Sequence, residues 1–270
     1  MSTSSKSQNP PKYKLGKLPV RHDPRTLLFG AYMKPGLAAP PPSKSWTANI
    51  APKGWEMMGN DTYGDCTCAA AGHMIMDWTA NTGPTVVIPT PDILKFYDHF
   101  SHGNADAGAN MLDVLKYWQS QGLDKHKIIV FTALELKNDV QVKDAVNLFG
   151  ACYIGVALPD FAVAAGKDPL QIPWIVPPKG PVGDAAPNPN NGHCIPAVAY
   201  DERNVYVVTW GQFKAMSWQF YNAYAEEAYA VIGKDWFAKK LNGKAPSGFD
   251  LATLEQDLKT LQAGAKKVAA

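Results

Sequence analysis

The hydrophobic pattern of this 270-residue chain changes from a helical period to a strand period part-way along its length. Apolar residues recur at helical spacing in four early segments, which we expect to be helices: 66–82, a segment opening at Thr90, 110–121 and 138–149. Apolar runs at 128–131 and 152–158 predict short buried strands. After residue 192 the pattern predicts a hairpin of strands 193–200 and 205–210, a helix over 217–227 and a strand over 228–232. Helices first and strands later favour a two-lobed α+β fold with a cleft between the lobes.

Composition narrows the classes of protein that this chain can belong to. Its 26 basic and 24 acidic residues give a net charge of +2, so we expect neither nucleic acid nor a membrane as a partner. Hydrophobic residues make up 46% and charged residues 19%, which is typical of a globular protein with a sizeable core. No run approaches the roughly 18 apolar residues that a membrane span needs, and the polar first ten residues do not resemble a secretory signal.

Proline and glycine divide the chain into three parts. Residues 1–45 contain runs of two and three prolines, so we expect an extended N-terminal arm. The arm carries apolar residues that indicate docking, and we expect it to pack on the back of the domain; the alternative is an inhibitor lying along the cleft. Residues 46–235 form the main domain, with a mainly helical lobe over 46–150 and a mainly β lobe over 151–235. Residues 236–270 are expected to be a C-terminal helical extension, capped by Asp250.

Two further features concern the β lobe. The segment 159–192 is rich in proline, glycine and asparagine, and a loop of this length is uncommon inside a compact domain unless it is functional. Pro196 lies inside the first strand of the predicted hairpin and indicates an edge strand or a bulge, because proline cannot donate a ladder hydrogen bond.

The most informative segment for chemistry is the turn that precedes the first helix. Residues 59–65 are rich in glycine, asparagine and aspartate, and they place Cys66 at the start of an apolar helix. A thiol at a helix N-terminus has a lowered pKa, which favours the nucleophilic thiolate. We expect the turn to expose Cys66, whereas Cys68 fits a small buried residue. The four cysteines are too few for a disulfide scaffold and lack the spacing of a zinc site, so we expect no metal and no cofactor.

A histidine at the entrance of the first hairpin strand complements this thiol. His193 follows Asn191-Gly192 and opens a strand, where it can lie across a cleft from Cys66. A thiol nucleophile needs a base that is close in space rather than in sequence. The other histidines are expected to be surface or packing residues.

These motifs resemble the papain-like cysteine peptidases in order and spacing. That family has an amide side chain six residues before the nucleophilic cysteine, and here Asn60 precedes Cys66 by six. The histidine-led strand is similar to residues 193–201, and a strand ending in Trp-Gly is similar to residues 207–211. The resemblance implies a helical lobe, an antiparallel β lobe and a cleft between them. It also implies that Gly155 and Cys194 line the substrate pocket and that Trp210 shields His193.

The sequence departs from the family at several positions. Val208 stands where the family keeps the asparagine that orients the histidine, and valine forms no side-chain hydrogen bond. We expect Thr209 or Gln212 to substitute. The family's glutamine is Asn60 here, which keeps an amide donor for the oxyanion. Tyr63 replaces a disulfide cysteine, and together with the polar N-terminus this favours a cytoplasmic or phage-associated relative over a secreted one.

The resemblance implies a thiol hydrolase that cleaves peptide or amide bonds. Cys66 would be the nucleophile, His193 the general base, and Asn60 with the Cys66 backbone N–H would stabilise the oxyanion. The expected partner is a peptide or protein substrate, and the sequence leaves the oligomeric state open. The alternative is a catalytically weak or inactive papain-like fold that binds peptides or has a structural role, because the amide and the orienting residue are both altered.

Overall fold

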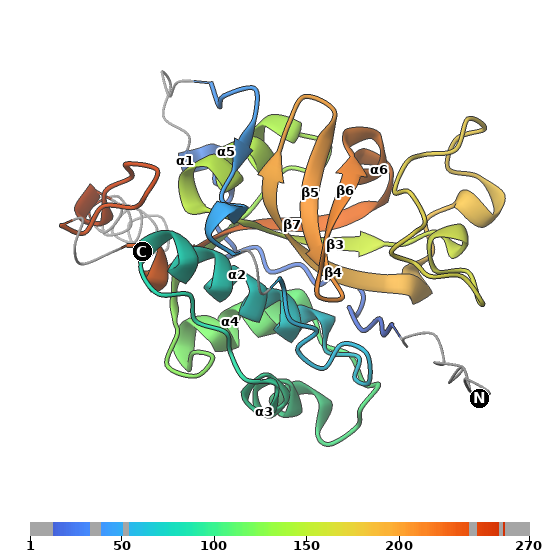
Figure 1. The fold of residues 1–270 in the computed structure, drawn as a ribbon, viewed down its shortest axis with the longest axis horizontal. Coiled ribbons are helices and arrows are strands. Elements are labelled where there is room, and N and C mark those ends of the chain that lie inside the picture. Colours follow the sequence, from blue (N-terminus) through green and yellow to red (C-terminus); the bar gives the residue numbers. More distant parts are fainter. Residues whose placement is uncertain (1–12, 33–38, 51–53, 238–241, 254–255, 257–270) are drawn as a thin grey trace, which may run out of the picture.

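A seven-stranded antiparallel sheet and a central helix form the frame of the protein (Figure 1). The structure is a computed structural model, and it describes residues 13–32, 39–50, 54–237, 242–253 and 256. The strands follow the order β2-β7-β3-β4-β5-β6, and β1 pairs with β4. Their bounds are β1 Lys44–Ser45, β2 Ile128–Ala133, β3 Cys152–Ala157, β4 Gly192–Tyr200, β5 Asn204–Thr209, β6 Gln212–Ser217 and β7 Ala225–Gly233.

Helix α2, Cys66–Thr82, is the longest helix of the described residues and lies in the middle of the protein. Every residue from Cys66 to Ala80 is buried, which explains why its sequence is apolar all round rather than on one stripe. The helix packs on β4, and it also contacts α3, Thr90–Ser101, and α4, Met111–Ser120. Gly72 permits the close approach of Met58 and Ile93, because a Cβ there would come within 2.5 Å of the Met58 sulfur.

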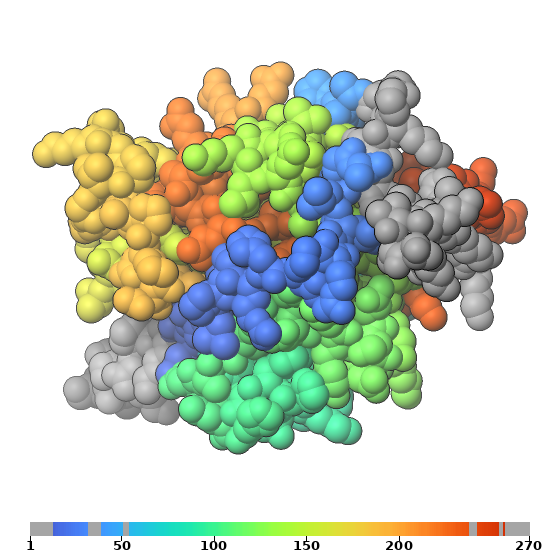
Figure 2. All heavy atoms as spheres, turned by 180° about the vertical axis from the view of Figure 1, so that it is seen from behind, coloured from blue at the N-terminus to red at the C-terminus, as the bar shows by residue number. Residues whose placement is uncertain are grey.

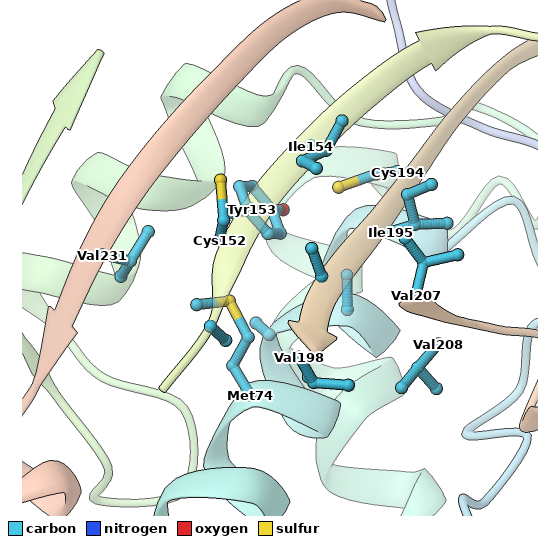
Figure 3. Close-up of a cluster of buried hydrophobic side chains, with 14 of the residues drawn as sticks. Met74, Cys152, Tyr153, Ile154, Cys194, Ile195, Val198, Val207, Val208 and Val231 are labelled. Atoms are coloured by element: carbon cyan, nitrogen blue, oxygen red, sulfur yellow. The ribbon is translucent and has the colours of Figure 1, made fainter. Parts of the chain in front are cut away.

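The remaining helices cover other parts of the sheet. Helix α5, Asp139–Phe149, begins at the side-chain cap of Asn138 and packs against β7 and β4. Helix α6, Trp218–Tyr224, begins at the cap of Ser217. Figure 3 shows part of the core, in which Met74 of α2 lies with Cys152 of β3, Val198 of β4 and Val208 of β5. The other short helices are α1 Phe29–Tyr32 and the 3-10 turns Thr47–Asn49, Asp160–Val163, Gly183–Ala185, Pro189–Asn191 and Lys234–Trp236.

The structure confirms the α+β class and corrects three details. Strand β6 was not expected, and the helix predicted over 217–227 ends at Tyr224 because Ala225 already pairs in β7. Strand β4 lies between β3 and β5, so Pro196 is not on an edge strand, although a register shift follows it between Ala197 and Ala199. The predicted C-terminal helix lies mostly outside the described residues; within them, Asp250 accepts hydrogen bonds from the backbone N–H of Ala252 and Thr253.

Membrane-spanning helices are absent from the part of the chain that the structure describes. The described helices are either too short or too polar to cross a bilayer.

Candidate active site

Cys66 is the first residue of α2, and its side chain is buried. Asp65 ends the preceding turn and is the N-cap residue of the helix. Its carbonyl accepts hydrogen bonds from the N–H groups of Cys68 and Ala69. The expectation of an exposed thiol with a lowered pKa is wrong in this state, since Cys66 is only 2% exposed and burial raises its pKa to about 12. The backbone of Cys194 and the charge of Lys17 act in the opposite direction and lower that pKa. The thiol is therefore neutral at pH 7 while the site is covered.

His193 lies on β4, the strand that packs on α2, and its ring is held on two sides. Its Nε2 is 2.8 Å from the Thr209 hydroxyl, which is the position of a hydrogen bond. The Trp210 ring stacks on the imidazole at 4.5 Å between centroids. The other ring nitrogen, Nδ1, is buried and has no hydrogen-bond partner among the described residues. Burial lowers the pKa of His193 to about 3, so the imidazole is also neutral at pH 7.

The β5–β6 hairpin positions Thr209 and Trp210, the two residues that contact the His193 ring. Thr209 and Gln212 are opposite each other, and the turn between them consists of Trp210 and Gly211, both with positive φ. Two positive φ values are typical of the two-residue hairpin turn that matches strand twist. A tryptophan in this region costs about 1–2 kcal/mol, which is consistent with the need to hold its ring over His193. Of the two substitutes expected for the missing asparagine, Thr209 meets the histidine, whereas Gln212 is exposed and makes no hydrogen bond to it.

Asn60 and Asp65 form the polar part of the turn before Cys66. Both are buried, and the Asn60 amide donates to the Tyr63 carbonyl at 3.2 Å. The two Asp65 carboxyl oxygens are buried without a hydrogen-bond partner in the described structure, and burial raises the pKa of Asp65 to about 8. The nearby Asn60 side chain lowers that pKa in part. Asp65 was not singled out in the sequence, because nothing local distinguishes it from an ordinary helix cap.

The two residues expected to line a substrate pocket are neighbours on the sheet. Gly155 of β3 pairs with Cys194 of β4, and on its other side it pairs with Glu227 of β7. Residues opposite each other in an antiparallel ladder point to the same face. That face looks toward α2, since Tyr153, two residues before Gly155, donates its hydroxyl to the Thr67 carbonyl at 2.7 Å.

Residues 14–18 of the N-terminal arm lie between the two lobes. Figure 2 shows its blue segment between the green helical part and the orange and yellow β part of the molecule. The Leu18 N–H donates to Ala109 in front of α4, and the N–H groups of Gly16 and Lys17 donate to the Gly192 carbonyl beside His193. For this segment the expectation that the arm packs on the back of the domain is therefore wrong, whereas Phe29 and β1, further along the arm, pack on α5 and β4. The hydrogen bonds of residues 16–18 join residues that are far apart in the sequence, so no local sequence pattern predicts them.

Close backbone contacts fix this segment at the site. A Cβ on Gly16 would lie 1.9 Å from the Gly64 carbonyl oxygen, and one on Gly192 would lie 2.1 Å from the Lys17 carbonyl oxygen. The Lys14 N–H donates to the Asn60 carbonyl, and the Lys14 carbonyl accepts from the Trp210 indole N–H at 2.9 Å. The arm thus contacts Asn60 and Gly64 on the side of Cys66, and Gly192 and Trp210 on the side of His193.

Among the described residues, no cluster of three or more histidine, cysteine, aspartate or glutamate side chains is placed to hold a metal ion. The described site consists of a thiol, an imidazole, a hydroxyl and amide groups, which suits acyl transfer through a covalent thioester.

Comparison with known proteins gives matches in structure but not in sequence. No family model matches the sequence, and no curated protein matches it. The fold is similar to xylellain, a cysteine protease from Xylella fastidiosa, at 15% identity and a TM-score of 0.62 over 84% of this chain and 99% of that one. It is also similar to digestive procathepsin L 3 of Tenebrio molitor, at 14% identity and a TM-score of 0.51 over 82% and 76%. A third match is the Carica candamarcensis cysteine protease CMS1MS2 in complex with E-64, at 14% identity and 0.50 over 71% and 98%.

These identities are too low to transfer an activity, but the agreement in fold covers most of the chain. The helix that starts at Cys66, the strand that starts near His193 and the sheet beside them agree with the resemblance found in the sequence. The protein has the α+β fold of the papain-like cysteine proteases, in a divergent form.

Proposed function

We propose that the protein is a thiol hydrolase of peptide or amide bonds, with Cys66 as nucleophile and His193 as general base, and that its arm keeps it latent. The Cys66 sulfur attacks the substrate carbonyl carbon while His193 takes the thiol proton. The C–N bond then breaks, and the proton passes from His193 to the leaving amine. A water molecule, losing a proton to His193, cleaves the thioester and restores the thiol.

The arrangement around His193 is the observation that carries the proposal. Thr209 binds one ring nitrogen, Trp210 covers the ring, and the second nitrogen is buried without a partner beside the residue that follows in the chain, Cys194, whose backbone lies close to the Cys66 thiol. A buried ring nitrogen without a hydrogen bond is costly unless it serves a purpose. Proton exchange with the Cys66 thiol supplies one. In this reading Thr209 takes the orienting role, and Asn60 with the Cys66 backbone N–H stabilises the oxyanion.

The latent state follows from the charges of the two groups. A neutral thiol with a pKa of about 12 and an imidazole with a pKa of about 3 do not form an ion pair at pH 7. Desolvation is the main cause of both shifts, and we infer that the arm contributes to it because its residues 14–17 contact the surroundings of the site. Displacement of the arm lets water and substrate reach the site and moves both pKa values toward the range in which a thiolate forms.

The test uses the full-length chain with the arm loosened by Gly16→Ala. We expect this variant to cleave an unstructured protein such as reduced, alkylated casein, with new termini identified by mass spectrometry. Cys66→Ala in the same background should abolish cleavage, and Cys68→Ala, a matched buried cysteine in the same helix turn, should keep it. The unmodified chain should cleave at least tenfold more slowly than the Gly16→Ala chain.

Two results would contradict the proposal. Cleavage that persists in the Cys66→Ala variant would point to a contaminating protease. A folded Gly16→Ala chain whose Cys66 reacts freely with iodoacetamide but which cleaves nothing would favour the alternative of a papain-like fold that binds peptides.

A further inference from the structure

A lysine of the arm fills a pocket in the β lobe beside the candidate site. Lys17 has a long charged side chain, yet that side chain is only 1% exposed. A Cβ on Gly155 would lie 2.5 Å from the Lys17 Cε and 2.5 Å from the Met111 sulfur, so the aliphatic stem lies directly over this glycine. The absence of a side chain at Gly155 therefore makes room for the lysine.

Two carboxylates lie at the end of this pocket. The Lys17 ammonium is 2.8 Å from a Glu226 oxygen, 3.5 Å from a Glu227 oxygen and 3.2 Å from the Leu18 carbonyl oxygen. The Glu227 side chain is 5% exposed, and its other oxygen accepts from the Tyr229 hydroxyl at 2.9 Å. The ammonium donates hydrogen bonds to Glu226 and to the Leu18 carbonyl, whereas the Glu227 oxygen that faces it is an ion-pair partner without a hydrogen bond.

The sheet register explains how two consecutive glutamates reach one ammonium. Gly155 pairs with Glu227, whereas the next residue, Val156, pairs with Ala225. Glu226 is the extra residue of a β-bulge, and bulges re-aim side chains at sites. Regular pairing would send Glu226 and Glu227 to opposite faces of the sheet.

The pocket is poorly suited to a neutral or acidic occupant. A buried carboxylate without a positive partner is strongly unfavourable, and removing one member of a buried ion pair costs more than the pair contributes. Burial already raises the pKa of Glu227, while Lys17 lowers it. The pocket lies within the cleft that the arm occupies, next to Cys194 on the same face of the sheet.

We infer that the pocket over Gly155, closed by Glu226 and Glu227, selects a basic side chain of the substrate, so that lysine- or arginine-containing peptides are its substrate class. Lys17 occupies the pocket as an internal substitute for that side chain. The inference rests on the proposed function for the reaction, but the binding preference itself can be measured without turnover.

The test measures binding of a peptide in trans to the full-length Gly16→Ala, Cys66→Ala chain, which is loosened at the arm and inert. The probe is a fluorescein-labelled peptide with the sequence of residues 13–21, Tyr-Lys-Leu-Gly-Lys-Leu-Pro-Val-Arg. Its partner carries norleucine in place of the fifth residue, which removes the charge and keeps the aliphatic stem. We expect the lysine peptide to bind at least tenfold more tightly by fluorescence anisotropy.

Variants of the pocket locate the effect. Glu227→Gln should reduce the difference in affinity between the two peptides to less than threefold. Glu226→Gln changes a more exposed residue, and it replaces Glu227→Gln in this test if that variant does not fold. The matched control is Glu202→Gln in the exposed β4–β5 turn, which should leave the tenfold difference unchanged. Equal binding of the two peptides, or no binding of either, would overturn the inference.

A second measurement separates this inference from the proposed function. In the active Gly16→Ala chain, fluorogenic peptide amides that differ only in lysine, arginine, norleucine or glutamate at the pocket position should show a kcat/KM at least tenfold higher for the two basic residues. Cysteine-dependent hydrolysis without that preference would contradict the inferred basic pocket and support the proposed hydrolase. A tenfold binding preference without hydrolysis would support the basic pocket and contradict the proposed hydrolase.

Discussion

At the scale of single residues, the groups around His193 differ from those that the papain-like resemblance implies. Val208 cannot orient a histidine, and it lies in the core instead. The next residue, Thr209, lies within hydrogen-bond distance of His193 Nε2. A hydroxyl is both a donor and an acceptor, so it can bind either tautomer of the ring. We propose Thr209 as a positioning residue for His193.

The positioning role predicts a graded effect of substitutions at Thr209. In the Gly16→Ala background, Thr209→Val should lower kcat/KM by roughly 10–10² fold, because an orienting group matters less than the nucleophile or the base. Thr209→Ser keeps the hydroxyl and should recover most of the rate. Casein cleavage and the pH profile of Cys66 alkylation provide the readouts, and the valine variant should shift the alkylation profile toward that of an ordinary thiol. Equal rates for valine and serine variants would show that the hydroxyl has no such role.

Asp65 predicts an unusual dependence of stability on pH. Its folded pKa of about 8 is above the ordinary value of 3.8, so the folded state binds a proton that the unfolded state releases. This contribution to stability is complete below pH 3.8 and is lost as pH rises toward 8. Asp65→Asn removes the ionisable group, so relative to the native chain it should gain roughly 5 kcal/mol between pH 4 and pH 8.

Urea unfolding at pH 4, 6 and 8 measures this difference. Asp61→Asn, in the exposed part of the same turn, is the matched control and should show no such trend. A difference between the Asp65 variant and the native chain that is constant with pH would mean that Asp65 is ionised in the folded state.

At the scale of elements, the arm and the glycines that receive it determine the state of the site. The arm is held by backbone bonds to Asn60, Ala109 and Gly192, and by ion pairs of Lys14 with Asp106 and of Lys116 with Asp23. The exposed ion pairs contribute little, whereas the buried contacts at Gly16 and Lys17 are sensitive to small changes in shape.

Gly16→Ala is expected to release the arm without disturbing the fold. Its Cβ has no room beside the Gly64 carbonyl, whereas the φ of Gly16 suits an ordinary residue. We expect the rate of Cys66 alkylation by iodoacetamide at pH 7.5 to rise at least tenfold, followed by mass spectrometry. Gly83→Ala, at the end of α2 with open space around its Cβ, is the control and should leave the rate unchanged. An unchanged rate in both variants would mean that the arm does not protect the thiol.

The elements also show what the sequence could and could not predict. Helices α2 and α5 were predicted because apolar spacing is a local signal, and β3 was predicted from its apolar run. Strand β6 escaped because Gln212–Ser217 alternates weakly, with both exposed and buried residues, and follows β5 after a two-residue turn. The pairing of Lys17 with Glu226, 209 residues apart, has no local signal at all.

At the scale of the whole molecule, the two lobes share one core. Helix α2 belongs to the helical part by sequence, yet it packs on β4, and Met74 lies among side chains of the sheet. The arm crosses the boundary between the lobes on the face shown in Figure 2, and it adds Phe29 to this core while Leu15 packs against it. We therefore expect the lobes to unfold together even when the arm is released.

Thermal unfolding followed by both far-UV circular dichroism and tryptophan fluorescence tests this expectation. Gly16→Ala should show one transition, at the same temperature by both probes. Met74→Ala should lower stability by about 2–5 kcal/mol, the range for truncating a buried methionine, and should also keep a single transition. Two separate transitions in either variant would mean that the lobes are independent units.

The central claim is that Cys66 and His193 form an activated pair once the arm is displaced. The most direct test is the pH dependence of Cys66 alkylation in three full-length chains: native, Gly16→Ala, and Gly16→Ala with His193→Ala. We predict slow labelling of the native chain from pH 5 to 8, rapid labelling of Gly16→Ala well below pH 8, and loss of that rapid labelling without His193. If the two Gly16→Ala chains instead label alike, with the midpoint of about 8.5 of a free cysteine, the pair does not form and the proposed mechanism is wrong.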